Sequence, residues 1–91
     1  MWLVYILYSR KLNKTYTGST NNFKERISKH NNGLVRSTKL GKPWIPVYVE
    51  FYPNETSARD REKHFKTSPG RRYLKNNIDS IIKFWLGSSD G

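Results

Sequence analysis

The sequence contains no cysteine, which excludes disulfide bonds and thiolate metal sites. It also lacks a long hydrophobic segment, because the apolar stretch near its N-terminus is far too short to cross a bilayer. No basic region precedes this stretch and no small-residue cleavage site follows it, although a secretory signal needs both. We therefore expect a soluble, cytoplasmic protein without a membrane partner.

Acidic residues are scarce, since the 91 residues include 7 Asp and Glu against 17 Lys and Arg. The resulting net charge of +10 and the pI near 10.1 indicate a polyanionic partner. Nucleic acid is the commonest such partner, although ribosome-bound and membrane-surface proteins carry similar charge. A chain of this length forms one small domain, which we expect over residues 1–86 with a disordered tail at 87–91.

The most apolar part of the chain is its N-terminal stretch. Residues 2–8 contain no polar residue apart from the tyrosines with their hydroxyls, a pattern typical of a strand that is covered on both faces. A polar connection follows over 9–14, and Tyr16 with its threonine neighbours indicates a second strand that returns beside the first. Tyr5 and Tyr16 are then neighbours. Taken alone, each of these tyrosines is expected to contribute to the core, as buried tyrosines usually do.

A helix is predicted over residues 21–32 by its apolar spacing and by the Asn-Asn-Gly stop at its end. Thr20 or Asn21 can accept hydrogen bonds from its first amides. Arg26 and His30 are four residues apart, so their side chains project from one face of this helix.

The segment 34–46 is predicted to be a loop by its glycine and two prolines. Its cations and hydroxyls, Lys39 among them, either hold phosphates or simply belong to a mobile basic loop. Trp44 is expected to anchor this loop on the domain, with base stacking as the alternative. β-Branched and aromatic residues predict a third strand over 47–52. Three interpretations are open for Glu50 within this strand: it is an acid of the site, it faces solvent, or it pairs with a basic group.

A second helix is predicted from about residue 54 to 67. Its apolar positions lie four residues before Glu62 and three residues after it, so the carboxylate falls on the stripe that faces the sheet. An acid there costs free energy unless a cation or a metal partners it. The structural alternative to a metal is an ion pair with Lys66 or with Arg26.

A last helix is predicted after this point, with Ser68 at its N-cap and Pro69 at its first helical position. Arg71 and Arg72 lie near its beginning. Apolar residues recur along it at helical spacing, so we expect it to lie across the sheet and complete the core. These residues are Leu74, Ile78, Ile81, Ile82 and Trp85.

The order of these features resembles the GIY-YIG nuclease superfamily over about residues 2–75. The first signature tripeptide is Leu3-Val4-Tyr5 and the second is Tyr16-Thr17-Gly18. Leu3 replaces the first glycine and Thr17 the central isoleucine, two positions whose side chains have no role in the chemistry. The family's Asn after the Glu has no aligned equivalent. The remaining family positions are Arg26, His30 and Glu62.

The resemblance implies an α+β fold with a small three-stranded antiparallel sheet flanked by helices. Similar domains occur in the incision subunit of nucleotide excision repair and in intron-homing endonucleases. A metal-dependent endonuclease is therefore implied, acting on DNA and selective for structure rather than sequence, because no separate recognition domain is present. The alternative is a non-catalytic module that binds DNA or RNA with the same fold.

The resemblance also implies roles for five side chains, which we expect to converge on one concave surface. Glu62 is expected to hold one Mg²⁺ or Mn²⁺ ion, since such an ion needs few protein carboxylates besides water and phosphate. Arg26 offers a planar fork of donors for phosphate oxygens as charge builds on them. Tyr16 is implied as the base for water, with Tyr5 hydrogen-bonding nearby, although a phenol with an ordinary pKa of about 10 needs cations for this. His30 can share the proton work, because the ordinary pKa of imidazole is nearer neutrality.

Binding is expected to depend on phosphate contacts and hence to weaken steeply with salt. The cations predicted to make these contacts are Lys39, Lys66, Arg71 and Arg72.

Overall fold

The computed structural model describes the backbone of residues 1–88 and the side chains of residues 1–81. Three strands, three α-helices and one 3₁₀-helix, η1, follow one another along this part of the chain. In order, they are β1 (Trp2–Ser9), β2 (Lys14–Thr20), α1 (Phe23–Asn31), η1 (Arg36–Gly41), β3 (Ile45–Tyr52), α2 (Glu55–Phe65) and α3 (Ser68–Ser88). None of the described helices is both long and apolar enough to cross a membrane.

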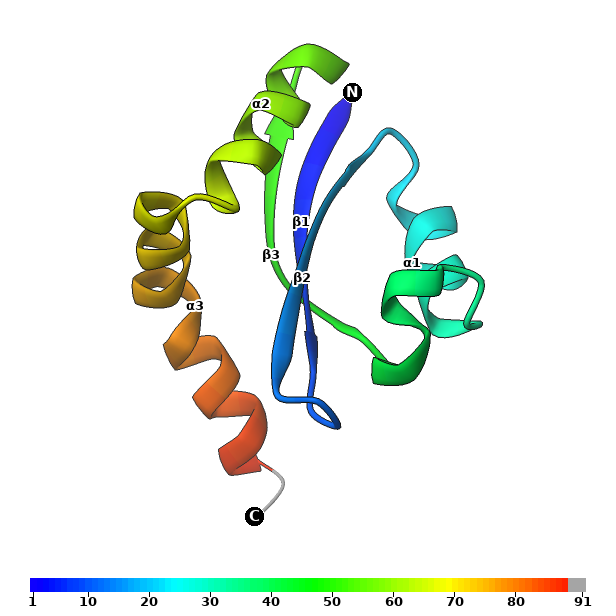
Figure 1. Cartoon of the computed structure of the whole chain (residues 1–91), viewed down its shortest axis with the longest axis vertical. Helices are drawn as coiled ribbons and strands as arrows, with labels where there is room; N and C mark the ends of the chain where they lie inside the picture. Colours follow the sequence, from blue (N-terminus) through cyan, green and yellow to red (C-terminus); the bar gives the residue numbers. More distant parts are fainter. Residues whose placement is uncertain (89–91) are drawn as a thin grey trace.

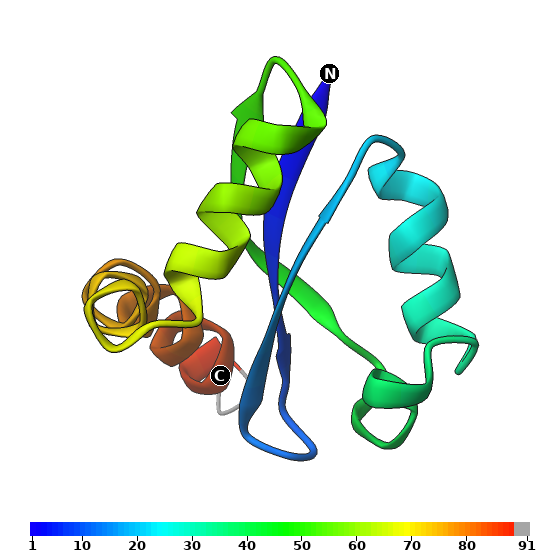
Figure 2. The same cartoon turned by 45° about the horizontal axis from the view of Figure 1, so that its top comes forward.

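The strands form one antiparallel sheet in the order β2-β1-β3, so β1 is central. Figures 1 and 2 show α2 and α3 on one side of this sheet, and α1 with η1 on the other. Alternate residues of β1 enter two different cores: Val4 and Ile6 pack toward α2 and α3, whereas Tyr5 and Leu7 pack toward α1. Both faces are therefore covered, which explains the unbroken apolar run and confirms the predicted α+β fold.

The strand β2 lies at one edge of the sheet, with β1 as its neighbour. Its register pairs Tyr5 with Gly18 and Leu7 with Tyr16. Because directly paired residues point to the same face, Tyr16 lies on the α1 side with Tyr5. Ser19 belongs to the opposite face, which α2 covers.

The predicted loop at 34–46 is more ordered than expected, because it contains η1 and the start of β3. The strand begins at Ile45, two residues earlier than predicted, and includes Pro46. A proline is tolerated there because β3 is the other edge strand and its register shifts opposite Ile6 and Leu7. Trp44 is 5% exposed and its indole N–H donates to the Thr38 carbonyl at 2.7 Å, so the predicted anchor is confirmed.

The first helix begins two residues later than predicted. Thr20 still belongs to β2, and its hydroxyl accepts the backbone N–H of Asn22 at 3.0 Å. Asn22 is therefore the N-cap, and its side chain accepts the N–H of Glu25 at 3.2 Å. The helix ends at Asn31, one residue before the predicted end and at the start of its Asn-Asn-Gly stop.

The junction of α2 and α3 also differs from the prediction by a residue or two. The helix α2 ends at Phe65, and Thr67 rather than Ser68 caps α3. The Thr67 hydroxyl accepts the N–H of Gly70 at 3.3 Å, and its carbonyl accepts that of Arg71 at 2.8 Å. A side chain at Gly70 would overlap the backbone of α2, so glycine permits the close junction.

The helix α3 contributes Leu74 and Ile78 to the core, and Ile81 packs against it. The side chains of Ile82 and Trp85, predicted to do the same, lie outside the described residues. The helix includes residues 87 and 88, which were expected in a disordered tail, and residues 89–91 lie outside the description.

Candidate active site

A small cavity of about 270 Å³ opens at the edge of β2. This cavity is lined by four of the five side chains that were expected to converge on one surface. They are Tyr5, Tyr16, Arg26 and Glu62, and the other lining residues are Gly18, Ser19, Arg59 and Lys63.

The cavity joins the two faces of the sheet around this edge. The tyrosines lie on the α1 side, whereas Glu62 comes from α2 on the other side and meets Ser19 there. Gly18 keeps the passage open, because a Cβ atom at this position would lie 2.5 Å from the Tyr5 hydroxyl oxygen. The expected concave surface therefore wraps around an edge strand rather than lying on one face.

Arg26 and the two tyrosines form one side of the cavity. The Nε–H of Arg26 donates to the Tyr5 hydroxyl at 3.3 Å, and the two tyrosine rings lie 6.4 Å apart. Burial raises the pKa of Tyr5 above its ordinary value, and the hydrogen bond from Arg26 only partly offsets this. Tyr5 is therefore a neutral phenol at physiological pH.

His30 does not share the cavity surface, so this part of the expectation was wrong. Its side chain is fully buried behind Tyr5, where α1 packs on the sheet. Its Nε2 lies 3.1 Å from the Tyr5 hydroxyl and its Nδ1 lies 2.7 Å from the Thr38 hydroxyl. Spacing along one helix placed His30 beside Arg26 but did not reveal how deeply each side chain is buried.

The hydrogen bonds around His30 fix its tautomer. The Thr38 hydroxyl donates to the Val35 carbonyl at 3.3 Å, so it accepts from His30 Nδ1–H. His30 Nε2 then carries no proton and accepts from the Tyr5 hydroxyl. Burial, assisted by the charge of Arg26, lowers the pKa of His30 to about 4. A neutral, enclosed imidazole of this kind orients Tyr5 and is a weak base for water.

Glu62 is held by two hydrogen bonds. Its Oε1 accepts from the Ser19 hydroxyl at 2.6 Å and its Oε2 from Lys66 Nζ at 2.8 Å. Partial burial raises the pKa of Glu62, but these hydrogen bonds and the charges of Lys66 and Arg59 outweigh burial and hold it below its ordinary value. The carboxylate is therefore ionised, and the ion pair with Lys66 that the sequence allowed is present.

The donor set suits a hard divalent cation that keeps most of its water. Within residues 1–81, no three His, Cys, Asp or Glu side chains cluster as a metal cage would require. Of the described residues that line the cavity, Glu62 is the one with a carboxylate, and Mg²⁺ is commonly held by one or two carboxylates plus substrate phosphate. Lys66 is 55% exposed, and an exposed pair of this kind contributes only about 0.3–0.5 kcal/mol, so a cation can displace it.

The predicted phosphate-binding cations divide into two groups. Lys66 and Arg71 line a second, larger groove beside the cavity. Lys39 lies on η1, on the other side of the sheet from α3 (Figure 1), and Arg72 is exposed without lining either hollow. Glu50 is no site acid here, because it pairs with Arg61 at 2.9 Å.

Four residues of this region were missed from the sequence. Ser19 follows Gly18, and strand alternation alone would have placed it on the α2 face. Arg59 and Lys63 flank Glu62 on one helix, so their spacing was a usable signal. Thr38 gave no signal, because the conformation of its segment was unknown.

Comparison with known proteins supports the resemblance. The family described as the GIY-YIG catalytic domain matches residues 1–76. UPF0213 protein CPE1444 of Clostridium perfringens is 42% identical over 81 residues, which cover 88% of this chain and 86% of that protein. An uncharacterized protein of Acanthamoeba polyphaga mimivirus is 32% identical over 88 residues, and this chain spans only 49% of its length. The solution NMR structure of UPF0213 protein BH0048 from Bacillus halodurans gives a TM-score of 0.51 at 28% identity over 84% of each chain.

Proposed function

Because this chain belongs to the GIY-YIG family, we propose that it is a divalent-metal-dependent endonuclease that hydrolyses phosphodiester bonds in DNA. Family membership indicates a nuclease-type domain that binds nucleic acid. The dependence on a metal ion and DNA as the substrate are what we propose beyond this. One observation carries it: an ionised carboxylate, Glu62, shares a small basic cavity with Arg26 and two tyrosines.

Each side chain in the cavity suits a step of hydrolysis. Arg26 is permanently charged, and its free donors can bind the phosphate oxygens as negative charge builds on them. Tyr16 lines the cavity. We assign its hydroxyl the role of the base that takes a proton from the attacking water. Tyr5 is held between Arg26 and His30, so His30 acts as a positioning residue. A Mg²⁺ or Mn²⁺ ion at Glu62 would neutralise charge on the leaving oxygen.

The alternative, a module that binds nucleic acid without cutting it, explains the basic surface equally well. It does not explain Glu62, because an acid inside a basic cavity weakens the binding of phosphate. The proposal includes selectivity for DNA structure rather than sequence.

A nicking assay tests the proposed function. Supercoiled and branched DNA are incubated with the protein in Mg²⁺, in Mn²⁺ or in EDTA, and cleavage is expected only with a metal. Arg26→Ala should slow cleavage by roughly 10²–10³, the scale seen when one preorganised donor is removed. Lys24→Ala, an exposed cation on the same helix, is the matched control and should cut normally. Cleavage that continues in EDTA, or that survives Arg26→Ala, would contradict the proposal.

A further inference from the structure

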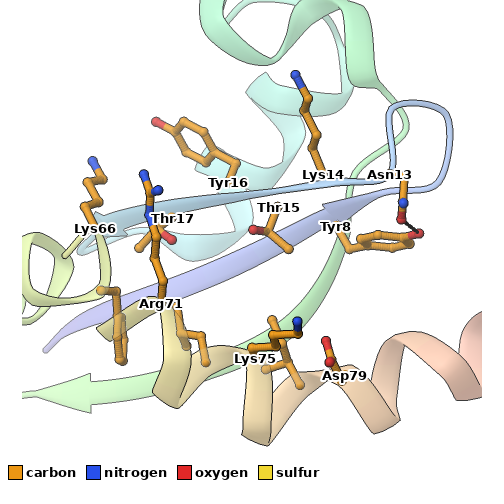
Figure 3. A pocket seen from close by; sticks show the side chains of 13 residues that line it. Tyr8, Asn13, Lys14, Thr15, Tyr16, Thr17, Lys66, Arg71, Lys75 and Asp79 are labelled. Atoms are coloured by element: carbon orange, nitrogen blue, oxygen red, sulfur yellow. Dashed lines mark hydrogen bonds between the residues drawn. The ribbon is translucent and has the colours of Figure 1, made fainter. Parts of the chain in front are cut away.

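A second hollow, a groove of about 930 Å³, lies between the edge strand β2 and the helix α3. Figure 3 shows Thr15 and Thr17 directed toward it from β2, with Arg71, Lys75 and Asp79 rising from α3. Tyr8 closes it from β1. Phe65 of α2 lines it as well, so the groove is built by two strands and two helices rather than by one loop.

We propose that this groove holds a single strand of DNA next to the bond that is cut. The proposal rests on the proposed function and extends it, because it names the form of the substrate on one side of the cavity. Charge, continuity with the cavity and the character of the groove's floor each support it.

The charge of the groove suits a polyphosphate. Among the described residues, four cations line it against one acid, Asp79. Arg71 and Lys75 are four residues apart and so lie on one face of α3. In Figure 3 the Arg71 side chain extends from α3 toward β2, whose Thr17 also lines the groove. Cations interleaved with hydroxyls are the usual protein contacts to phosphate oxygens. The four cations are Lys14, Lys66, Arg71 and Lys75.

The groove continues into the candidate active site. Tyr16 lines both hollows. Lys66 lines the groove and binds Glu62 of the smaller cavity at 2.8 Å. A strand that leaves the cavity past Lys66 would therefore enter the groove without leaving the basic surface.

The floor of the groove favours one strand over a duplex. Beneath the cations it is formed by apolar side chains, including Tyr8, Leu74 and Ile78. A duplex keeps its bases stacked inside and offers only phosphates and sugars to a protein groove of this kind. A single strand can place phosphates on the rim and turn bases toward apolar or aromatic surface. The combination of a cationic rim and an apolar floor therefore matches unpaired nucleotides.

Fluorescence anisotropy in EDTA measures binding without cleavage, so it does not depend on catalysis. An R71A/K75A double variant should bind a labelled single strand at least tenfold more weakly than the wild type. The plot of log affinity against log salt concentration should become less steep by about 1.4, which is 0.7 for each lost single-strand contact. Affinity for a blunt duplex should change less than twofold. A K24A/K29A double variant, which removes two exposed cations of α1 that line neither hollow, is the matched control and should bind both DNA forms like the wild type.

Photocrosslinking locates the bound strand directly. The chain has no cysteine, so Thr15→Cys provides one attachment point for a benzophenone label within the groove. It should crosslink to the unpaired flank of a DNA that has a duplex and a single-stranded part, whereas Asp60→Cys on exposed α2 should not.

The outcomes separate this proposal from the proposed function. If the R71A/K75A variant weakens duplex and single strand equally, or if Thr15→Cys crosslinks only to the duplex part, the groove proposal is overturned even when the protein cuts DNA. If the groove results appear as expected but no metal restores cleavage, the proposed function fails and the groove proposal stands.

Discussion

At Gly18 the backbone passes so close to Tyr5 that a single methyl group would change the cavity. A Cβ atom there would lie 2.5 Å from the Tyr5 hydroxyl oxygen and 3.1 Å from a ring carbon of Tyr16. Gly18→Ala should therefore push both rings aside and slow cleavage by about 10²-fold, the scale expected of a 1 Å misplacement. Overpacking should also lower the free energy of unfolding by about 1–3 kcal/mol.

Cleavage rates and thermal melts of this variant test the prediction, with Ser37→Ala, at an exposed position that lines neither hollow, as the control. Wild-type cleavage by a folded Gly18→Ala protein would show that the positions of the tyrosines do not matter.

His30 should make the stability of the fold depend on pH. Its pKa is lowered to about 4 in the folded protein, against about 6.5 for an ordinary histidine. Between these values the unfolded chain binds a proton that the folded chain does not, so stability falls as pH falls. The free energy of unfolding should drop by about 2 kcal/mol from this group between pH 7.5 and 5.

Urea unfolding at several pH values measures this effect. His30→Gln should show a flatter dependence over the same range, whereas His64→Gln, an exposed histidine, should behave like the wild type. Equal slopes for the wild type and His30→Gln would contradict the prediction.

At the scale of residues, the sequence predicted which side chains belong to the site better than how deeply each is buried. Tyr5, Tyr16, Arg26 and Glu62 share a cavity, as expected. His30 was misplaced because helical spacing gives direction around a helix but not distance from the surface. The hydrogen bond from Ser19 to Glu62 spans 43 positions, and no local pattern reveals a contact of that kind.

At the scale of elements, α2 is the helix that brings Glu62 to the site. An ion pair between Arg61 of α2 and Glu50 of β3 holds this helix against the sheet. Glu50 accepts hydrogen bonds from Tyr48, Tyr52 and Arg61, and its side chain is 17% exposed. Arg61→Ala leaves this carboxylate without its cation, which should lower the free energy of unfolding by about 2–3 kcal/mol. Arg59→Ala breaks an exposed pair on the same helix and should cost less than about 1 kcal/mol. Similar losses for the two variants, measured by urea unfolding, would argue against this account.

The N-cap of α3 gives a second test at this scale. Thr67→Ala removes the hydroxyl that accepts the Gly70 N–H, so it should cost about 1 kcal/mol. Ser68→Ala, the cap that the sequence suggested, should change stability by a few tenths of that amount. Thermal melts of both variants compare the two positions, and the reverse order would mean that Ser68 is the cap.

The types of the α-helices and strands were predictable because apolar residues recur at helical spacing in the helices and gather in short β-branched or aromatic runs in the strands, whereas η1 lay in a segment predicted as a loop. Their ends were less so, since neighbouring hydroxyl and amide side chains at 20–22 and at 67–68 can all cap a helix. Tertiary context decided between them: Thr20 is held in β2, and Gly70 must approach the backbone of α2. The early start of β3 depends on a register shift against β1 that no local pattern encodes.

At the scale of the whole molecule, the net charge of +10 is spread over the surface, and within the described residues 1–81 seven cationic side chains line the two hollows. Cations line both the small cavity and the neighbouring groove, on either side of the α2–α3 junction. Composition predicted a polyanionic partner, but only the fold shows that two basic hollows adjoin at the edge of β2 and that Tyr16 lines both. A cytoplasmic location stays a prediction from the sequence.

The central claim is that the Glu62 carboxylate serves cleavage rather than folding or binding. Glu62→Gln keeps the size of the side chain and removes the charge that a divalent cation needs. Because its partner Lys66 is exposed, the substitution should lower the free energy of unfolding by less than about 1 kcal/mol. DNA should bind as well as before or more tightly, because one negative charge leaves a basic cavity.

Metal-dependent cleavage by Glu62→Gln, measured beside its melting temperature and DNA affinity, tests this claim most directly. Glu55→Gln, the same substitution at an exposed site on the same helix, is the matched control and should cut normally. The account predicts a folded, DNA-binding Glu62→Gln protein whose cleavage has collapsed. A folded, DNA-binding variant that cuts at the wild-type rate would contradict it.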